Sequence, residues 1–176
     1  MIFTATALEG VWIVDLDRRE DERGYFARSY DAAEFAAHGL QPCDRQWSVS
    51  FNRLAGTLRG LHWQADPHQE AKLVRCTRGR VFDVAVDLRA SSPTRGQHVA
   101  VELSATTGRA LYIPPGCAHG FQTLEADSEL LYGISPEYVG GAARGVRFDD
   151  RRLAIPWPLP PVALSPRDLD LPEWQP

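Results

Sequence analysis

The sequence has almost no lysine, although basic residues are not scarce. Nineteen of its 176 residues are basic, and Lys72 is the only lysine beside 18 arginines. A lysine carries a compact point charge on one amine, whereas an arginine presents a wide, planar fork. Because the composition alone favours arginine at every basic position, the single amine is a candidate for stabilising charge on one oxygen atom.

The sequence also lacks long apolar runs and an excess of positive charge. No stretch reaches the length of a membrane span, and the first 20 residues have neither the basic start nor the cleavage site of a signal peptide. The net charge of −4 and a pI near 5.7 argue against nucleic-acid and anionic-membrane partners. We therefore expect a cytoplasmic protein with no nucleic-acid and no membrane partner.

Cysteine is scarce. Cys43, Cys76 and Cys117 share no CxxC or zinc-type spacing, and their odd number excludes a complete disulfide framework. We expect them to be reduced thiols that are buried as small hydrophobic side chains.

Short β-strand patterns fill most of the chain, which we interpret as a single domain over residues 1–176. Runs rich in Val, Ile, Leu and aromatic residues alternate with Gly and Pro; among them are VWIVDL, RQWSVSF, TLRGLHW, KLVRCTR, RVFDVAVDLR, QHVAVELS, RALYIP, HGFQTL and ELLYGI. Many short strands separated by turn signals are typical of an all-β sandwich or barrel. We predict an eight-stranded, cupin-like jelly roll with room inside for one small ligand.

Two other segments interrupt this pattern. The segment DAAEFAAHG predicts a short helix near the N-terminus, with Asp31 as N-cap, Glu34 three residues later and Gly39 as C-cap. From Pro156 onwards the sequence is rich in proline. We expect this tail to be irregular and to wrap around the barrel.

The sequence contains part of the metal-binding pattern of cupins. His62, Glu70 and His119 occupy ligand positions, but Gln64 stands where a second histidine of the His-x-His pair is expected. Imidazole and carboxylate groups supply most of the affinity of such a site, so this set favours no bound metal. Without a metal, His62 remains a credible base at neutral pH, because an unperturbed histidine has a pKa of about 6.5.

A series of motifs resembles one family in both order and spacing. LRGLHWQ, KLVRCTRGRVFDVAVDLR, SPTRG, IPPGCAHGFQTL, LLYGISPEY, RGVRFDD, IPWPL and LSPRD, with DERGYF near the N-terminus, are similar to the dTDP-4-dehydrorhamnose 3,5-epimerase family from about Val11 to Asp168. The resemblance implies a metal-independent jelly-roll homodimer that uses no cofactor. It also implies a substrate, a dTDP-linked 4-keto-6-deoxyhexose, that is inverted at C3 and C5.

The resemblance assigns roles to individual residues. It implies that His62 is the catalytic base, that Asp168 orients it, and that Tyr132 is the acid on the opposite face of the sugar. Lys72 is implied to stabilise the enolate at the C4 oxygen, and His119 to lie near the ketone. Further substrate-binding positions are Arg23, Arg59 and Arg167 for the diphosphate, and Phe26, Gln46 and Tyr138 for the nucleotide or sugar.

Several positions depart from the family pattern, and they leave alternatives open. Arg28, Ser48 and Ala143 stand where a glutamate, an asparagine and an acidic contact are common, and Glu70 replaces a glutamine. The reaction class is therefore better indicated than the exact sugar or nucleotide. The alternatives are an epimerase that inverts one centre of a related keto sugar, a metal-dependent cupin enzyme, and a non-catalytic sugar-binding jelly roll.

Overall fold

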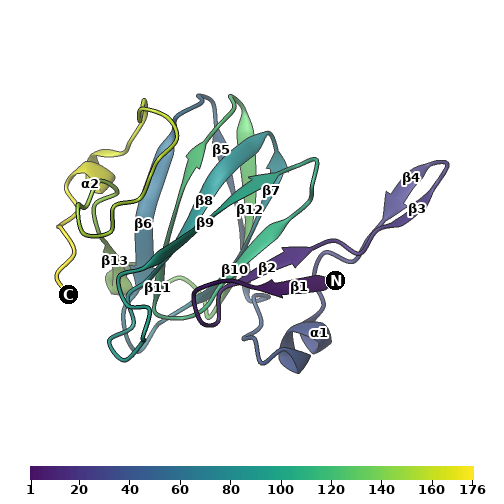
Figure 1. Ribbon diagram of the computed structural model, residues 1–176, viewed down its shortest axis with the longest axis horizontal. Coiled ribbons are helices and arrows are strands. Elements are labelled where there is room, and N and C mark those ends of the chain that lie inside the picture. Colours follow the sequence, from purple (N-terminus) through teal and green to yellow (C-terminus); the bar gives the residue numbers. More distant parts are fainter.

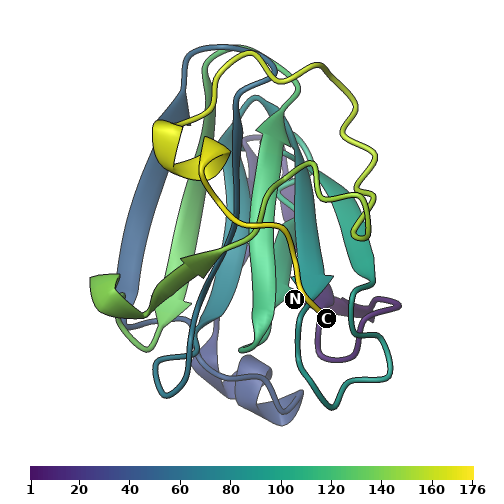
Figure 2. The same ribbon diagram turned by 90° about the vertical axis from the view of Figure 1, so that its left-hand side faces the viewer.

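The computed structural model describes residues 1–176, and most of its regular structure is antiparallel β-sheet. Two sheets lie face to face (Figures 1 and 2). The six-stranded sheet contains, in order, β1 (Ile2–Ala5), β2 (Trp12–Asp15), β10 (Ala110–Ile113), β7 (Ala71–Arg78), β12 (Ser128–Ser135) and β5 (Gln46–Asn52). The five-stranded sheet contains β13 (Ala143–Gly145), β6 (Leu58–Gln64), β11 (Cys117–Thr123), β8 (Arg80–Asp87) and β9 (His98–Ser104). The predicted all-β jelly roll is confirmed, with more strands than the expected eight because short strands such as β1 and β13 extend the sheet edges.

The main hydrophobic core fills the space between the two sheets. Val74, Leu111 and Leu130 of the six-stranded sheet pack with Val81 and Phe121 of the five-stranded sheet, and all five are buried. In a strand, residues two apart point to the same face. Tyr132, two residues after Leu130 on β12, and His119, two residues before Phe121 on β11, therefore also point into the space between the sheets. At their level this space is a cavity.

Strand β8 is buried on both faces. Val81 and Ala85 belong to the core between the sheets, whereas Val84 and Val86 belong to a second cluster on the outer face. Trp157 and Trp174, from the C-terminal tail, pack against that outer cluster. The tail thus covers the outside of the five-stranded sheet, as the sequence predicted (Figure 2).

The predicted helix is present as α1 (Ala32–Ala37). The side chain of Asp31 caps it by accepting hydrogen bonds from two N–H groups of the first turn, at 2.9 and 3.1 Å. Phe35 anchors the helix to the protein and is fully buried. The C-cap is His38, one residue earlier than predicted, and Gly39 follows it with a φ of 69°. No helix of the structure is long and apolar enough to cross a membrane.

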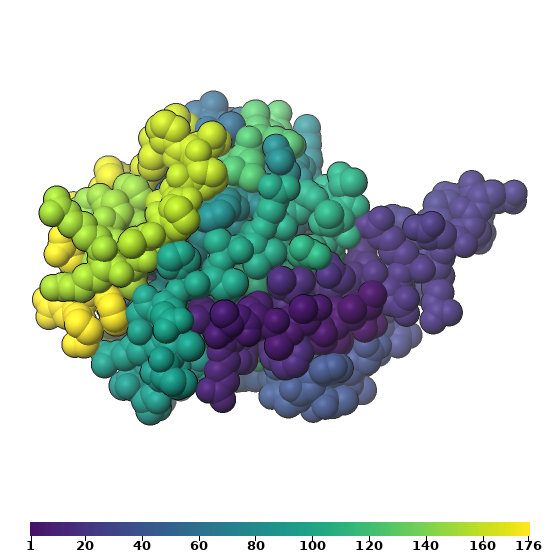
Figure 3. Space-filling model, in the orientation of Figure 1, coloured from purple at the N-terminus to yellow at the C-terminus, as the bar shows by residue number.

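A two-stranded hairpin, β3 (Arg19–Asp21) and β4 (Gly24–Phe26), projects from the body of the molecule (Figures 1 and 3). Phe26 at its base is 75% exposed, and Arg23 lies in its turn. An apolar side chain with this exposure has no hydrophobic environment within its own chain.

The tail contains one element that the sequence analysis did not predict. Pro166–Leu169 form the one-turn helix α2, whose first turn is capped by the Ser165 hydroxyl, which accepts a hydrogen bond from the Asp168 N–H at 3.1 Å. A 3-10 turn, η1 (Gly140–Ala142), precedes β13. Helix α2 contacts β6, so the tail reaches the edge of the interior cavity.

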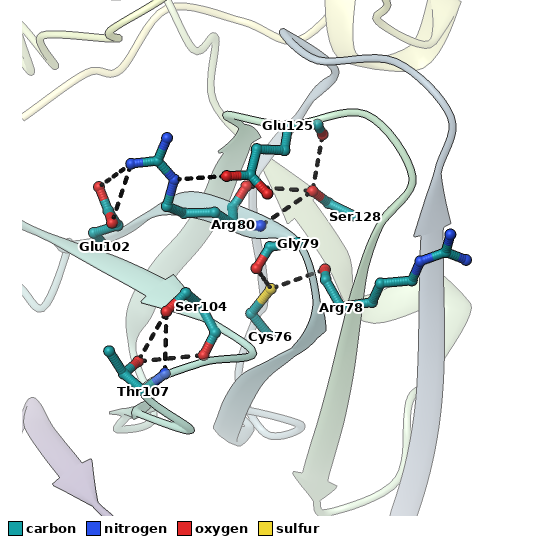
Figure 4. Close-up of polar contacts among 9 residues, drawn as sticks. All are labelled: Cys76, Arg78, Gly79, Arg80, Glu102, Ser104, Thr107, Glu125 and Ser128. Atoms are coloured by element: carbon teal, nitrogen blue, oxygen red, sulfur yellow. Dashed lines mark hydrogen bonds and ion pairs between the residues drawn. The ribbon is translucent and has the colours of Figure 1, made fainter.

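The three cysteines are buried free thiols, as predicted. Burial raises the pKa of Cys43 and Cys117 to about 12 and that of Cys76 to about 11. The Cys76 thiol donates to the carbonyl oxygens of Arg78 and Gly79 at 3.2 and 3.3 Å (Figure 4). These thiols therefore have a structural role in the interior.

Candidate active site

A cavity of about 420 Å³ lies between the two sheets. Its walls come from β5, β7 and β12 on one side, from β6 and β11 on the other, and from the tail. Eight of the expected catalytic and substrate-binding residues line it: Arg59, His62, Lys72, His119, Tyr132, Tyr138, Arg167 and Asp168. The fold thus brings together groups that are spread over more than a hundred residues of sequence.

A local irregularity in β6 places two of these side chains in the same cavity. His62 pairs with His119 of β11, and the register then shifts before Arg59. Since β6 advances by three residues where β11 advances by two, Arg59 and His62 both face inwards. The strands approach closely here: a Cβ on Gly60, which has a φ of 125°, would lie 2.6 Å from the Cα of Gly120. Only glycine fits at position 60.

His62 and Asp168 form a hydrogen-bonded pair, with Nε2 and Oδ1 2.6 Å apart. With Nε2–H donated to the carboxylate, Nδ1 is the free nitrogen and can accept a proton. Burial by itself would raise the pKa of Asp168, but the hydrogen bond and charge of His62, the Gly60 N–H and the Ser165 side chain together hold this pKa below its usual value. Asp168 is therefore a carboxylate at neutral pH and stabilises a protonated His62.

Lys72 is held in the cavity wall by two contacts. Its Nζ lies 2.8 Å from Oε1 of Glu70 and donates a hydrogen bond to the carbonyl oxygen of His62 at 3.2 Å. The side chains of Lys72 and Glu70 are only 10% and 5% exposed. The second carboxylate oxygen of Glu70 is buried and has no partner. The lone amine is thus a fixed, desolvated charge beside His62, and it lines the cavity, where one oxygen atom can approach it.

Tyr132 lines the cavity from the sheet opposite to that of His62. Its ring packs edge-on against the His119 imidazole, with ring centres 5.8 Å apart. Burial and the negative charge of Asp83 raise the pKa of Tyr132 well above its usual value, and they outweigh Arg59 and the Ser50 side chain, which lower it. The phenol therefore keeps its proton at neutral pH and is available as a donor.

Asp83 is a site residue that the sequence analysis did not single out. It is fully buried on β8, and its Oδ1 lies 2.8 Å from Nε2 of His119. The other oxygen, Oδ2, is buried without a partner. The signal in the sequence was a charged residue at an inward position of the strand RVFDVAVD, between Val81 and Ala85. Asp83 fixes the orientation of His119 and leaves its Nδ1 without a protein partner.

The remaining predicted residues divide between the cavity and the outside. Tyr138 lines the cavity mouth, and its N–H donates to Oε1 of Gln46 at 2.9 Å, so Gln46 supports the mouth without lining the cavity. Arg23 and Phe26 lie on the projecting hairpin, outside the cavity of their own chain (Figure 1). Their roles in substrate binding stay predictions.

The partial cupin pattern does not form a cluster of ligands. The Gln64 amide donates to the carbonyl oxygen of His68 at 3.1 Å and accepts a hydrogen bond from the N–H of Val139. Its polar atoms therefore join two loops of the protein. The structure contains no group of three or more His, Cys, Asp or Glu side chains that could hold a metal ion.

The chain is similar in sequence and in fold to proteins of known function. The family model for dTDP-4-dehydrorhamnose 3,5-epimerase matches residues 5–176. A dTDP-4-dehydrorhamnose 3,5-epimerase of Sinorhizobium fredii is 39% identical over 173 residues, which are 98% of this chain and 89% of that protein. A dTDP-4-dehydrorhamnose 3-epimerase of Streptomyces niveus is 39% identical over 166 residues, 93% of this chain and 79% of that protein. The crystal structure of the 3,5-epimerase from Elizabethkingia anophelis superposes with a TM-score of 0.95 at 38% identity, covering 99% of this chain and 96% of that one.

The similarity extends over nearly the whole chain, and the family recognised from the sequence motifs is confirmed. The fold, the His62–Asp168 pair and the buried Lys72 all lie within the matched residues. This chain belongs to the dTDP-4-dehydrorhamnose 3,5-epimerase family of carbohydrate epimerases.

Proposed function

We propose that this protein inverts C3 and C5 of a dTDP-linked 4-keto-6-deoxyhexose, with no cofactor. The observation that carries the proposal is that His62 and Tyr132, a base and an acid, line one cavity from opposite sheets, beside the buried Lys72. Inversion needs this arrangement, because the proton must leave one face of a carbon and return on the other.

The chemistry explains why a cation is needed. Both C3 and C5 flank the C4 ketone, and their C–H groups are still much weaker acids than imidazolium. A gap on the order of ten pK units corresponds to roughly 14 kcal/mol for proton removal. A positive charge set against the C4 oxygen stabilises the enolate more than the ketone, so it acts mainly on the transition state. Lys72 supplies this charge.

The reaction at each centre has two proton transfers. In the first, Nδ1 of His62 takes the proton from carbon, the C–H electrons move to the C4 oxygen, and Lys72 donates a hydrogen bond to that oxygen. Asp168, 2.6 Å from Nε2, stabilises the imidazolium that forms. In the second, Tyr132 donates its phenolic proton to the opposite face of the carbon while the ketone forms again. Exchange with water restores the phenol and the neutral imidazole.

The nucleotide diphosphate is assigned to the arginines. Arg59 and Arg167 line the cavity, and a guanidinium can bind phosphate oxygens in bidentate fashion. Tyr138, at the mouth and 49% exposed, is placed to contact the nucleotide or sugar, and Gln46 holds the backbone at that position.

We further propose that the protein acts as a homodimer in which Arg23 and Phe26 enter the partner's cavity. Two features support this arrangement. The edge strand β5 presents Trp47, Val49 and Phe51 to solvent, with exposures of 45%, 61% and 43%. The β3–β4 hairpin extends away from its own chain (Figure 3), and its two aromatic side chains, Tyr25 and Phe26, are 49% and 75% exposed. An uncovered apolar row of this kind marks a protein interface.

Subunit mixing tests this proposal. His62→Ala and Arg23→Ala proteins are each expected to have low activity. In a mixed dimer, one cavity has His62 from one chain and Arg23 from the other, so activity should return after subunit exchange. Light scattering measures the dimer mass independently. A monomeric protein with full activity would contradict the arrangement.

We propose a cytoplasmic setting without a nucleic-acid or membrane partner. The three buried thiols are compatible with a reducing compartment. The net charge of −4 does not favour binding to nucleic acid or to an anionic membrane.

The central test is incubation with dTDP-4-keto-6-deoxyglucose in deuterated water. We expect deuterium at both C3 and C5, with inverted configuration, in the presence of EDTA. Loss of exchange on chelation, with recovery on addition of a divalent ion, would favour the metal-dependent alternative.

A second candidate function is inversion of one centre only. Ser48 and Ala143 line the cavity where the family commonly has larger polar groups, and the Streptomyces niveus relative is named as a 3-epimerase. The same experiment separates the two: deuterium at C3 alone, at long incubation times, supports the single-centre enzyme.

A further inference from the structure

Arg59 makes a side-chain contact that differs from those of the other arginines. Its Nε donates a hydrogen bond to Oδ1 of Asn52 at 2.8 Å. Every other arginine that donates to a side chain donates to a carboxylate: Arg23, Arg28, Arg80, Arg89, Arg109 and Arg147. An amide oxygen orients a guanidinium without neutralising its charge. Arg59 is therefore held in place as an uncompensated cation.

The orientation of the Asn52 amide is fixed by its other bonds. Asn52 ends β5 and is 2% exposed. Its Nδ2 donates to the carbonyl oxygens of Ser50 and Ser128, both at 3.2 Å. Since the two amide hydrogens are used on these carbonyls, the oxygen must face Arg59. The contact is thus specified by a network of three strands.

The far end of this network is buried and hydrogen-bonded. Ser128 is fully buried, and its hydroxyl donates to the carbonyl oxygen of Glu125 at 2.8 Å and accepts a hydrogen bond from the N–H of Arg80 at 3.3 Å (Figure 4). Figure 4 also shows the contrasting case of Arg80, whose guanidinium pairs with both Glu102 and Glu125.

The contact determines which atoms of Arg59 remain available. With Nε engaged, the two terminal nitrogens have no hydrogen bond and no ion pair in the structure, and the residue lines the cavity. Two parallel N–H groups on a fixed plane match two oxygens of a phosphate group. The free side of the fork is therefore suited to a diphosphate.

We propose that Asn52 is a positioning residue for diphosphate recognition: it orients Arg59 through Nε and leaves the positive charge of Arg59 free for the substrate. This inference rests on the proposed function, because it takes the diphosphate as the anion that Arg59 binds. It predicts that Asn52→Asp weakens binding of the diphosphate more than Asn52→Ala does, because a carboxylate neutralises the charge of Arg59 and an amide does not.

The test compares Asn52→Ala with Asn52→Asp. Both variants lose the two N–H donors to the carbonyl oxygens of Ser50 and Ser128, and in Asn52→Asp a carboxylate oxygen also faces these carbonyls. Thermal unfolding measures the resulting loss of stability in each variant. By titration calorimetry, we expect the Kd for dTDP to rise about threefold in Asn52→Ala and at least about tenfold in Asn52→Asp, the latter being about 1.4 kcal/mol. The affinity of Asn52→Asp should also depend less on ionic strength. In both, KM should rise by a larger factor than kcat falls.

A measurement on the unaltered protein avoids any effect of folding. Asn52 is the only asparagine in the chain, so labelling with ¹⁵N-asparagine gives one pair of side-chain amide signals. Titration with inorganic pyrophosphate or dTDP should shift this pair, although Asn52 is buried, and the shift should be lost in Arg59→Ala. Equal Kd values for Asn52→Asp and Asn52→Ala, or amide signals that do not move as dTDP binds, would overturn the role of Asn52. Failure of the unaltered protein to bind dTDP would instead overturn the proposed function.

Discussion

Nε2 of His62 on β6 lies 2.6 Å from Oδ1 of Asp168 in helix α2, and the two residues are 106 positions apart in the sequence. The tail therefore supplies one half of the proposed catalytic pair in addition to covering the outer face of a sheet. Helix α2 is one turn long. The Asp168 N–H donates a hydrogen bond to the Ser165 hydroxyl, and this cap holds the Asp168 carboxylate towards β6.

Asp168→Asn should reduce kcat by roughly 10²- to 10⁴-fold, the range that a positioned base contributes. An asparagine can donate an N–H to Nε2, which moves the proton of the neutral ring to Nδ1, so the nitrogen that faces the substrate loses its lone pair. The measurement is the rate of deuterium incorporation under saturating substrate. A loss of less than tenfold, with the protein folded, would show that His62 does not depend on this contact.

The same pair should contribute to stability in a pH-dependent way. The pKa of Asp168 is below its usual value of 3.8, so its stabilising contribution is fully present above about pH 4 and is lost as the pH falls through the folded-state value. The difference in free energy of unfolding between the unaltered protein and Asp168→Asn should therefore shrink below about pH 4. Urea unfolding between pH 3 and 7 measures it, and a constant difference would exclude a paired carboxylate.

Tyr132→Phe should separate proton removal from inversion. His62 and Lys72 remain, so exchange of the substrate proton with deuterated water should continue. Net inversion should fall strongly, because the phenol that donates from the opposite wall is gone. NMR of the product at C3 and C5 distinguishes the two processes. Normal inversion by Tyr132→Phe would assign the acid to another group.

Much of this fold and site could be predicted from the sequence, because the determining features are local or shared by the family. The apolar run RVFDVAVDLR predicted β8, Asp31 predicted the start of α1, and the motif residues His62 and Tyr132 do line one cavity. These features follow from strand composition, capping chemistry and resemblance.

The remaining features depend on contacts between distant strands. The register shift that turns Arg59 into the same cavity as His62 requires the close approach of β6 and β11. The partners Asp83 and Asn52 act on side chains 36 and 7 positions away, through geometry that no sequence spacing reveals. The hairpin with Arg23 and Phe26 lies outside the cavity of its own chain, where the family motif gave no indication of its position.

Asp83→Asn should lower kcat by about tenfold or more through His119, and a double-mutant cycle can show this. In a His119→Ala background the same change should have little further effect, because the two residues act as a unit. Asp87→Asn is the matched control: Asp87 is also buried on β8 but bonds to Arg89, Ser92 and Thr94, away from the cavity. It should reduce the melting temperature without showing coupling to His119. Additive effects of Asp83 and His119 would contradict the assignment.

Lys72→Arg should be damaging although it keeps the charge. Lys72 is buried and is fixed by Glu70 and by the carbonyl oxygen of His62, so a longer, planar guanidinium cannot place the same charge density on the C4 oxygen. Removing one fixed donor from an oxyanion site typically costs about 3–4 kcal/mol. We expect at least about a tenfold loss of kcat in Lys72→Arg and a larger loss in Lys72→Met, with smaller changes in substrate affinity.

Glu70 provides the control that separates charge placement from folding. Lys72→Met alone leaves the Glu70 carboxylate buried and unpaired, which should lower stability markedly. The double variant Lys72→Met with Glu70→Gln removes both charges, so its melting temperature should recover most of the loss while kcat stays low. Recovery of activity together with stability would mean that Lys72 only neutralises Glu70. A Lys72→Arg enzyme with near-normal kcat would show that any cation suffices, and that the single lysine of this sequence has no special chemical role.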